Sequence, residues 1–165
     1  MRYILQHPDL VLKLTLEHIQ ISAISVIISL VIGVIIGIIL TRVKFLQAPV
    51  IGLAGVLYTI PALALFAMLI PFMGLGLKPT VFALILYSQL AIVRNTVSGI
   101  ETIDPSIIEV AKGMGMTGWQ RLFLVELPLG LPVIMAGVRM VTVMAIGVAT
   151  IASFISAGGL GDLIY

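Results

Sequence analysis

Charged and hydrogen-bonding side chains are concentrated in residues 101–128, ETIDPSIIEVAKGMGMTGWQRLFLVELP. Between residues 19 and 100 there is no aspartate or glutamate. The ionisable bases in that range are Arg42, Lys44, Lys78 and Arg94. Because apolar blocks long enough to cross a bilayer flank residues 101–128, the polar face of this segment must meet water or another protein. The chemistry that this segment favours is recognition of a partner.

Residue types that support catalysis or metal binding are sparse. The chain contains no cysteine, which excludes disulfides, thiolate catalysis and cysteine-ligated metals. His7 and His18 are isolated histidines, more typical of interfacial polar residues than of metal ligands. The sequence has no phosphate-binding motif of the form G-x-x-x-x-G-K-[ST], and no acidic pair is placed to hold magnesium. We therefore expect no catalytic site, no cofactor and no metal, so the chain is not expected to be an enzyme.

The composition is that of a membrane protein, with 61% hydrophobic residues, 10% charged residues and a mean hydropathy of +1.26. The formal charge of +2 is too small to indicate a nucleic-acid partner. We predict an all-α polytopic helical bundle in which residues 1–165 form one transmembrane domain. Residues 1–18 are predicted to form an interfacial helix. The predicted spans are residues 19–40, 49–70, 80–100 and 129–157.

Three features of the predicted spans bear on packing. In the first span, small residues recur every fourth position, which predicts a helix-packing face more than a pore-lining groove; they are Ser25, Ser29, Gly33 and Gly37. Pro61 predicts a kink in the middle of the second span. Arg94 is expected to reach the membrane interface by snorkelling, with a wet cavity as the less favoured alternative. Arg139 is expected to mark the boundary at which the last span enters the hydrocarbon.

The distribution of basic residues predicts the orientation of the chain in the cytoplasmic membrane. One side of the four-span arrangement holds Arg42, Lys44, Arg94, Lys112, Arg121 and Arg139, against Arg2, Lys13 and Lys78 on the other. The more basic side, which includes residues 101–128, is predicted to be cytoplasmic. The N-terminus and the turn at residues 158–162 are then external.

Residues 101–128 carry signals for two short helices. Asp104 followed by Pro105 predicts a helix start, and the helix is expected to end near Gly113. Glycines at positions 113, 115 and 118 predict the bend that follows. Thr117 with Gln120 predicts a capping box for a second helix that stops near Pro128. Such an element suits docking into a groove on a partner protein.

The spacing within residues 101–128 resembles the cytoplasmic signature of permeases from ABC importers. That signature is written E-A-A, three residues, G, nine residues, I, one residue, L-P. The matching residues here are Glu109, Val110, Ala111, Gly115, Val125, Leu127 and Pro128. Val110 replaces alanine and Val125 replaces isoleucine. The resemblance implies a type I importer permease in which Glu109, Ala111, Gly115, Val125, Leu127 and Pro128 belong to a coupling helix that docks on the ATP-hydrolysing subunit.

Nearly the whole chain resembles the permeases of osmoprotectant importers, which take up glycine betaine, carnitine, choline and similar solutes. The segments that carry this likeness are TIPALALF, LYSQLAIVRNT, AKGMGMT, ELPLGLPVIMAGVRM and ATIASFISAGGLGD. Permeases of the methionine type share part of the architecture, so an amino-acid substrate is kept as an alternative. Because such permeases usually continue beyond the GGLGD turn, we expect the present chain to be shortened at its C-terminal end.

The resemblance also implies the partners. ABC ATPase subunits, a second permease subunit of the same or a paralogous sequence, and an external solute-binding protein are expected to work with this chain in the bilayer. An ion-coupled secondary carrier is a less favoured alternative, because the spans contain no acidic residue to bind a driving ion. A membrane scaffold without transport activity is another. No substrate site is assigned, because the available aromatic residues lie in different elements; they are Tyr58, Phe66, Phe82, Tyr87 and Trp119.

Overall fold

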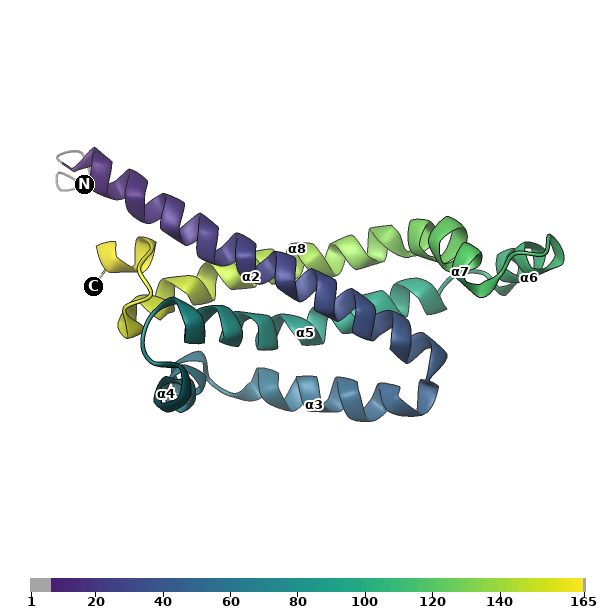
Figure 1. Ribbon diagram of the computed structural model, residues 1–165, viewed down its shortest axis with the longest axis horizontal. Coiled ribbons are helices and arrows are strands. Elements are labelled where there is room, and N and C mark those ends of the chain that lie inside the picture. Colours follow the sequence, from purple (N-terminus) through teal and green to yellow (C-terminus); the bar gives the residue numbers. More distant parts are fainter. Residues whose placement is uncertain (1–6, 165) are drawn as a thin grey trace.

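The computed structural model describes residues 7–164, which contain helices and no strand. Long helices α2 (Pro8–Arg42), α5 (Leu77–Glu101) and α8 (Leu127–Ile151) lie side by side, with α3 (Gln47–Thr59) along one flank (Figure 1). The shorter helix α4 (Ala62–Met73) crosses their direction. Helices α6 (Pro105–Gly113) and α7 (Gly118–Arg121) project from one end. The N-terminus and C-terminus lie at the opposite end.

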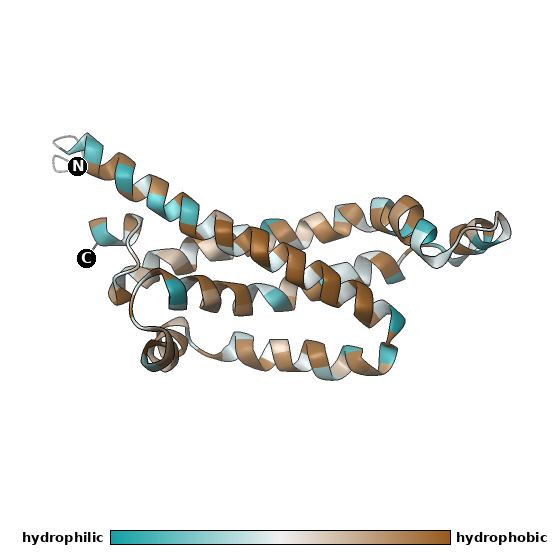
Figure 2. Ribbon diagram, in the orientation of Figure 1, coloured by the Kyte–Doolittle hydropathy of each residue, from teal (hydrophilic) through white to brown (hydrophobic). Residues whose placement is uncertain are grey.

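Three helical stretches are long and apolar enough to cross a membrane: Pro8–Arg42, Leu77–Glu101 and Gly118–Ile155. A fourth arises if the bent pair Lys44–Thr59 and Ala62–Met73 counts as one broken span. Many large apolar side chains on these helices face outward, among them Ile27 at 61% exposure and Val143 at 68%. Figure 2 shows the apolar residues along the shafts of the helices. This pattern confirms the predicted all-α membrane fold, because outward apolar side chains suit contact with lipid.

Helix α2 differs from the prediction at its start. No break separates residues 8–18 from the first span, since one helix of 35 residues runs from Pro8 to Arg42. Pro8 occupies the first turn, where its missing N–H is harmless, and Asp9 adds a favourable negative charge there. At about 1.5 Å per residue, α2 is much longer than the hydrocarbon core of about 30 Å. Part of it must therefore lie outside the hydrocarbon, and an interfacial position for residues 8–18 stays a prediction.

The predicted packing face on α2 is confirmed. Ser25 and Ser29 are fully buried. A Cβ atom on Gly33 would lie 2.6 Å from Cγ2 of Ile92, and one on Gly37 would lie 2.5 Å from Cβ of Thr96. Both partners belong to α5, so the small residues let the side chains of α5 pack directly against the backbone of α2. The stripe is a buried seam between two helices and does not line a groove.

The second predicted span is interrupted more sharply than a kink. Helix α3 ends at Thr59, α4 begins at Ala62, and the two are bent by 98°. Ile60 has an extended backbone, with φ −67° and ψ 127°, as expected for a residue that precedes proline. Its carbonyl accepts a hydrogen bond of 2.6 Å from the hydroxyl of Tyr87 on α5. Residues 49–70 are therefore two helices, and α5 satisfies a carbonyl left free at the break.

The third and fourth predicted spans correspond to α5 and α8. Helix α8 is followed by a 3-10 turn at Ala152–Ile155 and by Ser156, whose φ of 58° ends the helix. A second 3-10 turn occupies Leu160–Leu163. Arg139 lies at the midpoint of α8, and its position at the edge of the hydrocarbon stays a prediction. The largest buried cluster joins Phe66 of α4, Tyr87 of α5 and Ala152 beyond α8.

Candidate functional site

Helix α6 begins as its sequence predicts. The carboxylate of Asp104 accepts a hydrogen bond of 2.8 Å from the backbone N–H of Ser106, and Pro105 fills the first helical position. This bond stabilises the charged form of the cap, so it lowers the pKa of Asp104 from its ordinary value of 3.8. Asp104 therefore fixes the point at which the chain leaves α5 and turns into α6.

Helix α6 ends in a Schellman motif built around Gly115. The N–H of Gly115 donates to the carbonyl of Lys112 at 2.9 Å, and the N–H of Met116 donates to the carbonyl of Ala111 at 3.2 Å. Gly115 has a φ of +77°, a left-handed conformation that side chains disfavour. No atom lies within 4 Å of a Cβ built on it, so the backbone conformation, and not a lack of space, is the reason that glycine is favoured here.

The predicted capping box is present, whereas the predicted end of the second helix is wrong. Thr117 accepts a hydrogen bond of 3.3 Å from the N–H of Gln120, whose side chain accepts one of 2.8 Å from the N–H of Thr117. Helix α7 then passes through a π-helical turn at Leu122–Glu126 directly into α8. Pro128 lies in the first turn of α8, where the wide π turn accommodates its missing N–H.

The six predicted coupling residues fall into four places. Ala111 and Val125 line one cavity of about 240 Å³ between α6 and the π turn. Glu109 faces a different cavity of about 370 Å³ at the base of α6. Gly115 forms the exposed bend. Leu127 and Pro128 begin α8. The structure therefore brings Ala111 and Val125 to one cavity. Gly115, Leu127 and Pro128 instead occupy positions where the backbone bends or a helix begins.

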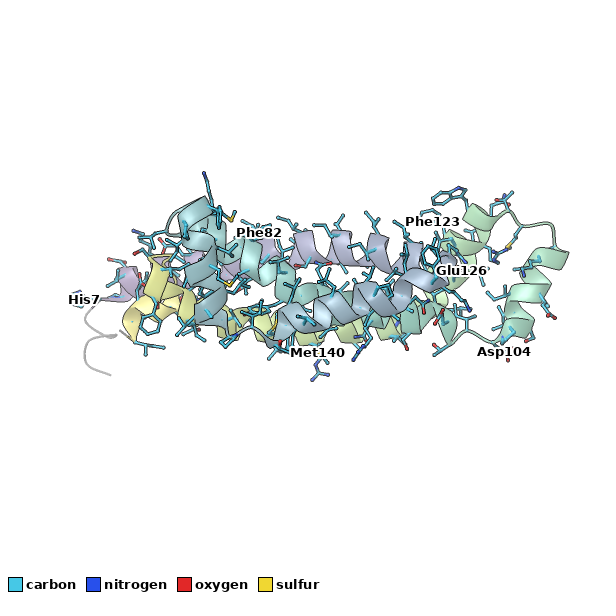
Figure 3. The ribbon with its side chains drawn as sticks, turned by 90° about the horizontal axis from the view of Figure 1, so that it is seen from below. His7, Phe82, Asp104, Phe123, Glu126 and Met140 are labelled. Atoms are coloured by element: carbon cyan, nitrogen blue, oxygen red, sulfur yellow. The ribbon has the colours of Figure 1, made fainter. Side chains whose placement is uncertain are left out.

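Glu126 is a site residue that sequence reasoning missed. Its side chain is only 3% exposed and lies between two arginines. Arg42, the last residue of α2, donates one hydrogen bond to it, and Arg121 of α7 donates another of 2.8 Å. Figure 3 shows Glu126 at the same end of the molecule as Asp104. The signal that could have found it is an acidic residue isolated within the apolar run LFLVELP.

A second set of polar contacts ties the base of the loop to the corner between α2 and α3. Glu101, the last residue of α5, accepts a hydrogen bond of 2.8 Å from Gln47 and lies 4.0 Å from the ammonium of Lys44. Both of these partners precede or begin α3. The two ends of the segment 101–126 are therefore held by polar contacts to the α2–α3 region. The segment is therefore connected to α2 by polar contacts, as well as to α5 and α8 by the chain itself.

The loop also presents apolar side chains to solvent. Val110 and Met114 of the α6 region are 63% and 65% exposed, and Trp119 is 72% exposed. The rings of Trp119 and Phe123 stack with centroids 6.0 Å apart. Exposed apolar groups beside Glu109 and Lys112 are typical of a protein-docking surface. We call the surface formed by these exposed residues of α6 and α7 the α6–α7 face.

The histidines and aromatic residues singled out in the sequence have distinct positions. His18 is buried, and its ring bonds to the carbonyl of Ile146 and the N–H of Leu160, which holds the C-terminal turn on α2. Within residues 7–164, no group of three potential ligands is arranged for a metal. Tyr58 and Tyr87 are brought together with ring centroids 5.9 Å apart, whereas Trp119 lies in α7 at the loop end.

Comparison with known proteins gives a family match over most of the chain. The model of the family described as "Binding-protein-dependent transport system inner membrane component" matches residues 19–165. The chain is 46% identical to the glycine betaine/carnitine/choline transport system permease protein OpuCB of Bacillus subtilis, over 90% of this chain and 69% of the relative. It is 44% identical to the osmoprotectant import permease protein OsmW of Salmonella typhimurium, over 98% of this chain and 78% of the relative.

A third relative, the choline transport system permease protein OpuBB of Bacillus subtilis, is 47% identical over 92% of this chain and 70% of its own length. Among solved structures, an inward-facing conformation of the MetNI methionine ABC transporter superposes with a TM-score of 0.85. That likeness covers 96% of this chain and 80% of the matched chain at 23% identity. At this identity it indicates a shared fold and carries no statement about the substrate.

Proposed function

Since the chain belongs to the family of binding-protein-dependent transport system inner membrane components, we propose that it is a permease for compatible solutes such as glycine betaine, carnitine or choline. The observation that carries the proposal is its 44–47% identity, over at least nine-tenths of the chain, to permeases named for these solutes. The methionine alternative rests on fold similarity at 23% identity and is correspondingly weaker.

In this proposal ATP is hydrolysed by separate subunits, and the α6–α7 face is the surface on which such a subunit docks. Three features support that role. The caps at Asp104 and Gly115 fix both ends of α6, exposed apolar side chains lie beside charged ones, and Glu126 joins this region to α2. Glu109 contributes charge at the base of α6, while Ala111 and Val125 line the cavity between α6 and the π turn.

The transport step is alternation between inward-open and outward-open states. ATP binding and hydrolysis bias this equilibrium only if the ATPase contacts the two states differently. The polar contacts of Glu126 with Arg42 and of Glu101 with Gln47 give a movement of α6 a route into the spans. A second permease subunit completes the pathway, and a solute-binding protein delivers substrate to the end that carries Lys78 and the turn at residues 158–162. The loop end is cytoplasmic.

The test is purification of the assembled complex followed by uptake into vesicles. The permease should co-purify with an ATPase that carries a phosphate-binding motif. Vesicles should then accumulate glycine betaine, carnitine or choline when ATP and the binding protein are supplied. Uptake of methionine alone would overturn the substrate assignment. A complex that lacks an ATPase and uses an ion gradient would overturn the whole proposal.

A further inference from the structure

A cavity of about 180 Å³ lies among α3, α5 and α8, away from the α6–α7 face. Its walls include Tyr58, Tyr87, Arg94, Asn95, Met140 and Met144. This volume is large enough to hold a small organic solute. Tyr87 lies near the middle of α5, Arg94 lies two turns closer to its C-terminal end, and Figure 3 shows Met140 midway along the molecule. Substrate sites of membrane transporters typically lie near this depth.

The two tyrosine rings form an aromatic corner. Their centroids are 5.9 Å apart, and their planes are nearly perpendicular at 85°. Tyr87 is held in place because its hydroxyl donates to the carbonyl of Ile60 at the break between α3 and α4. Tyr58 retains 48% exposure, so its ring is accessible to a solute. Perpendicular rings offer faces to a quaternary ammonium group, and the nearby methionine sulfurs are polarisable.

Arg94 supplies a positive charge within reach of this corner. Between residues 7 and 164 it has no ion pair and no side-chain hydrogen bond, unlike Arg42 and Arg121. Arg94 follows Tyr87 by seven residues, which places both on the same face of α5 two turns apart. Long side chains on a helix lean toward its N-terminus, which here is the direction of Tyr87. Arg94 is exposed and lines the wall of this largely apolar cavity, where a guanidinium without a protein partner is suited to bind a carboxylate.

We propose that this cavity binds trimethylammonium carboxylates, with the ammonium against Tyr58 and Tyr87 and the carboxylate on Arg94. Both charges of a zwitterion such as glycine betaine or carnitine are then satisfied. Choline carries the same ammonium but no carboxylate, so it gains nothing from Arg94 and is repelled by it. The permease thereby adds a preference for betaines over choline to the selectivity of the binding protein. This inference rests on the proposed function and assigns its solute a place in the membrane.

The test compares glycine betaine and choline uptake by the assembled importer in vesicles, with one unaltered binding protein throughout. Because the binding protein is constant, a change in the ratio of the two uptake rates must arise in the permease. Arg94→Gln should lower glycine betaine uptake by about tenfold or more, as expected for loss of a hydrogen bond to a charged group. Choline uptake should be unchanged or higher. Arg94→Lys, which keeps the charge, should retain more glycine betaine uptake than Arg94→Gln.

The aromatic corner is tested on the same vesicles. Tyr58→Leu should lower uptake of both solutes by about tenfold, whereas Tyr58→Phe, which keeps the ring, should stay near the unaltered rate. Phe82→Leu is the matched control, because Phe82 lies on α5 outside the cavity. An unchanged solute ratio in Arg94→Gln, or equal losses in Tyr58→Phe and Tyr58→Leu, would overturn the inference. If the unaltered importer takes up neither solute, the proposed function itself fails.

Discussion

Glu126 shows how one buried carboxylate can join two parts of a membrane protein. It lies in the π-helical turn before α8, yet it receives hydrogen bonds from Arg42 at the end of α2 and Arg121 in α7. Removing one partner of a buried ion pair leaves an uncompensated charge and is far more destabilising than losing an exposed pair. The contacts of Glu126 are therefore expected to fix the α6–α7 face relative to α2.

Replacement of Glu126 with alanine should destabilise the protein by about 3–5 kcal/mol, toward the lower end because Arg42 remains 43% exposed. The thermal unfolding midpoint of the purified complex provides the measurement. Glu101→Ala is the matched control, since its long ion pair with Lys44 and its hydrogen bond from Gln47 are both exposed and are each worth about 1 kcal/mol or less. Equal effects of the two substitutions would show that burial of Glu126 has no energetic consequence.

At the residue scale, the helix caps and the bend of the loop could be predicted from the sequence, because they depend on contacts between residues close together in the chain. Asp104, Gly115, Thr117 and Gln120 act through hydrogen bonds that span at most five residues, so their spacing was sufficient evidence. Glu126 and the pairing of Tyr58 with Tyr87 depend on contacts 84 and 29 residues apart in sequence, which only the fold reveals. The role of the six signature residues in coupling stays a prediction.

Helix α6 depends on its C-terminal motif. Leucine at Gly115 should cost about 1–2 kcal/mol in the left-handed conformation and distort the bend into α7. ATPase recruitment and solute uptake should both fall in Gly115→Leu, measured by co-purification and vesicle transport. Gly115→Asn is the control, because asparagine tolerates this conformation, and it should retain most of both activities. Full transport by Gly115→Leu would contradict the role given to the bend.

The close packing of α2 against α5 can also be tested by substitution. Gly37→Val should destabilise the protein by about 1–3 kcal/mol, because its side chain would overlap Thr96. Gly55→Val on α3 is the matched control, since nothing lies within 4 Å of a Cβ there. Thermal unfolding of the two variants in the same detergent provides the comparison. A similar midpoint for both would contradict close packing at Gly37.

Helix boundaries were predicted well where a local sequence signal marks them. They were predicted less well where contacts between distant residues determine where a helix begins or ends. The limits of α6 match the expectation because Asp104, Pro105 and Gly115 mark them. The continuity of α2 through residue 18 could not be inferred, since His18 is held by Ile146 and Leu160 from the far end of the chain. The angle between α3 and α4 at Pro61 likewise involves a distant contact, the hydrogen bond from Tyr87 to Ile60.

At the scale of the whole molecule, the two ends have different chemistry. One end gathers the α6–α7 face, Arg42, Lys44 and Glu101, while the other carries Lys78 and the C-terminal turn. This separation agrees with the predicted orientation, in which the basic loop end is cytoplasmic. The cavity at Tyr58, Tyr87 and Arg94 lies between the end proposed to receive the solute and the end proposed to bind the ATPase.

The orientation can be measured directly because the chain contains no cysteine. Lys112→Cys on α6 should react with a membrane-impermeant maleimide only when the cytoplasmic face is accessible. Lys78→Cys at the start of α5 should react only from the external face. Uptake by each variant confirms that the labelled protein is assembled. Labelling of the two positions from the same side would contradict the arrangement of the spans.

The most direct test of the central claim is the energy source of transport in sealed vesicles that hold the assembled importer. Accumulation of glycine betaine should require ATP on the side of the membrane that carries the α6–α7 face. It should stop when the ATPase subunit is made unable to hydrolyse ATP, and it should be unaffected by collapse of ion gradients. Accumulation that persists without ATP hydrolysis and follows an ion gradient would contradict the assignment of this chain as the permease of an ATP-driven importer.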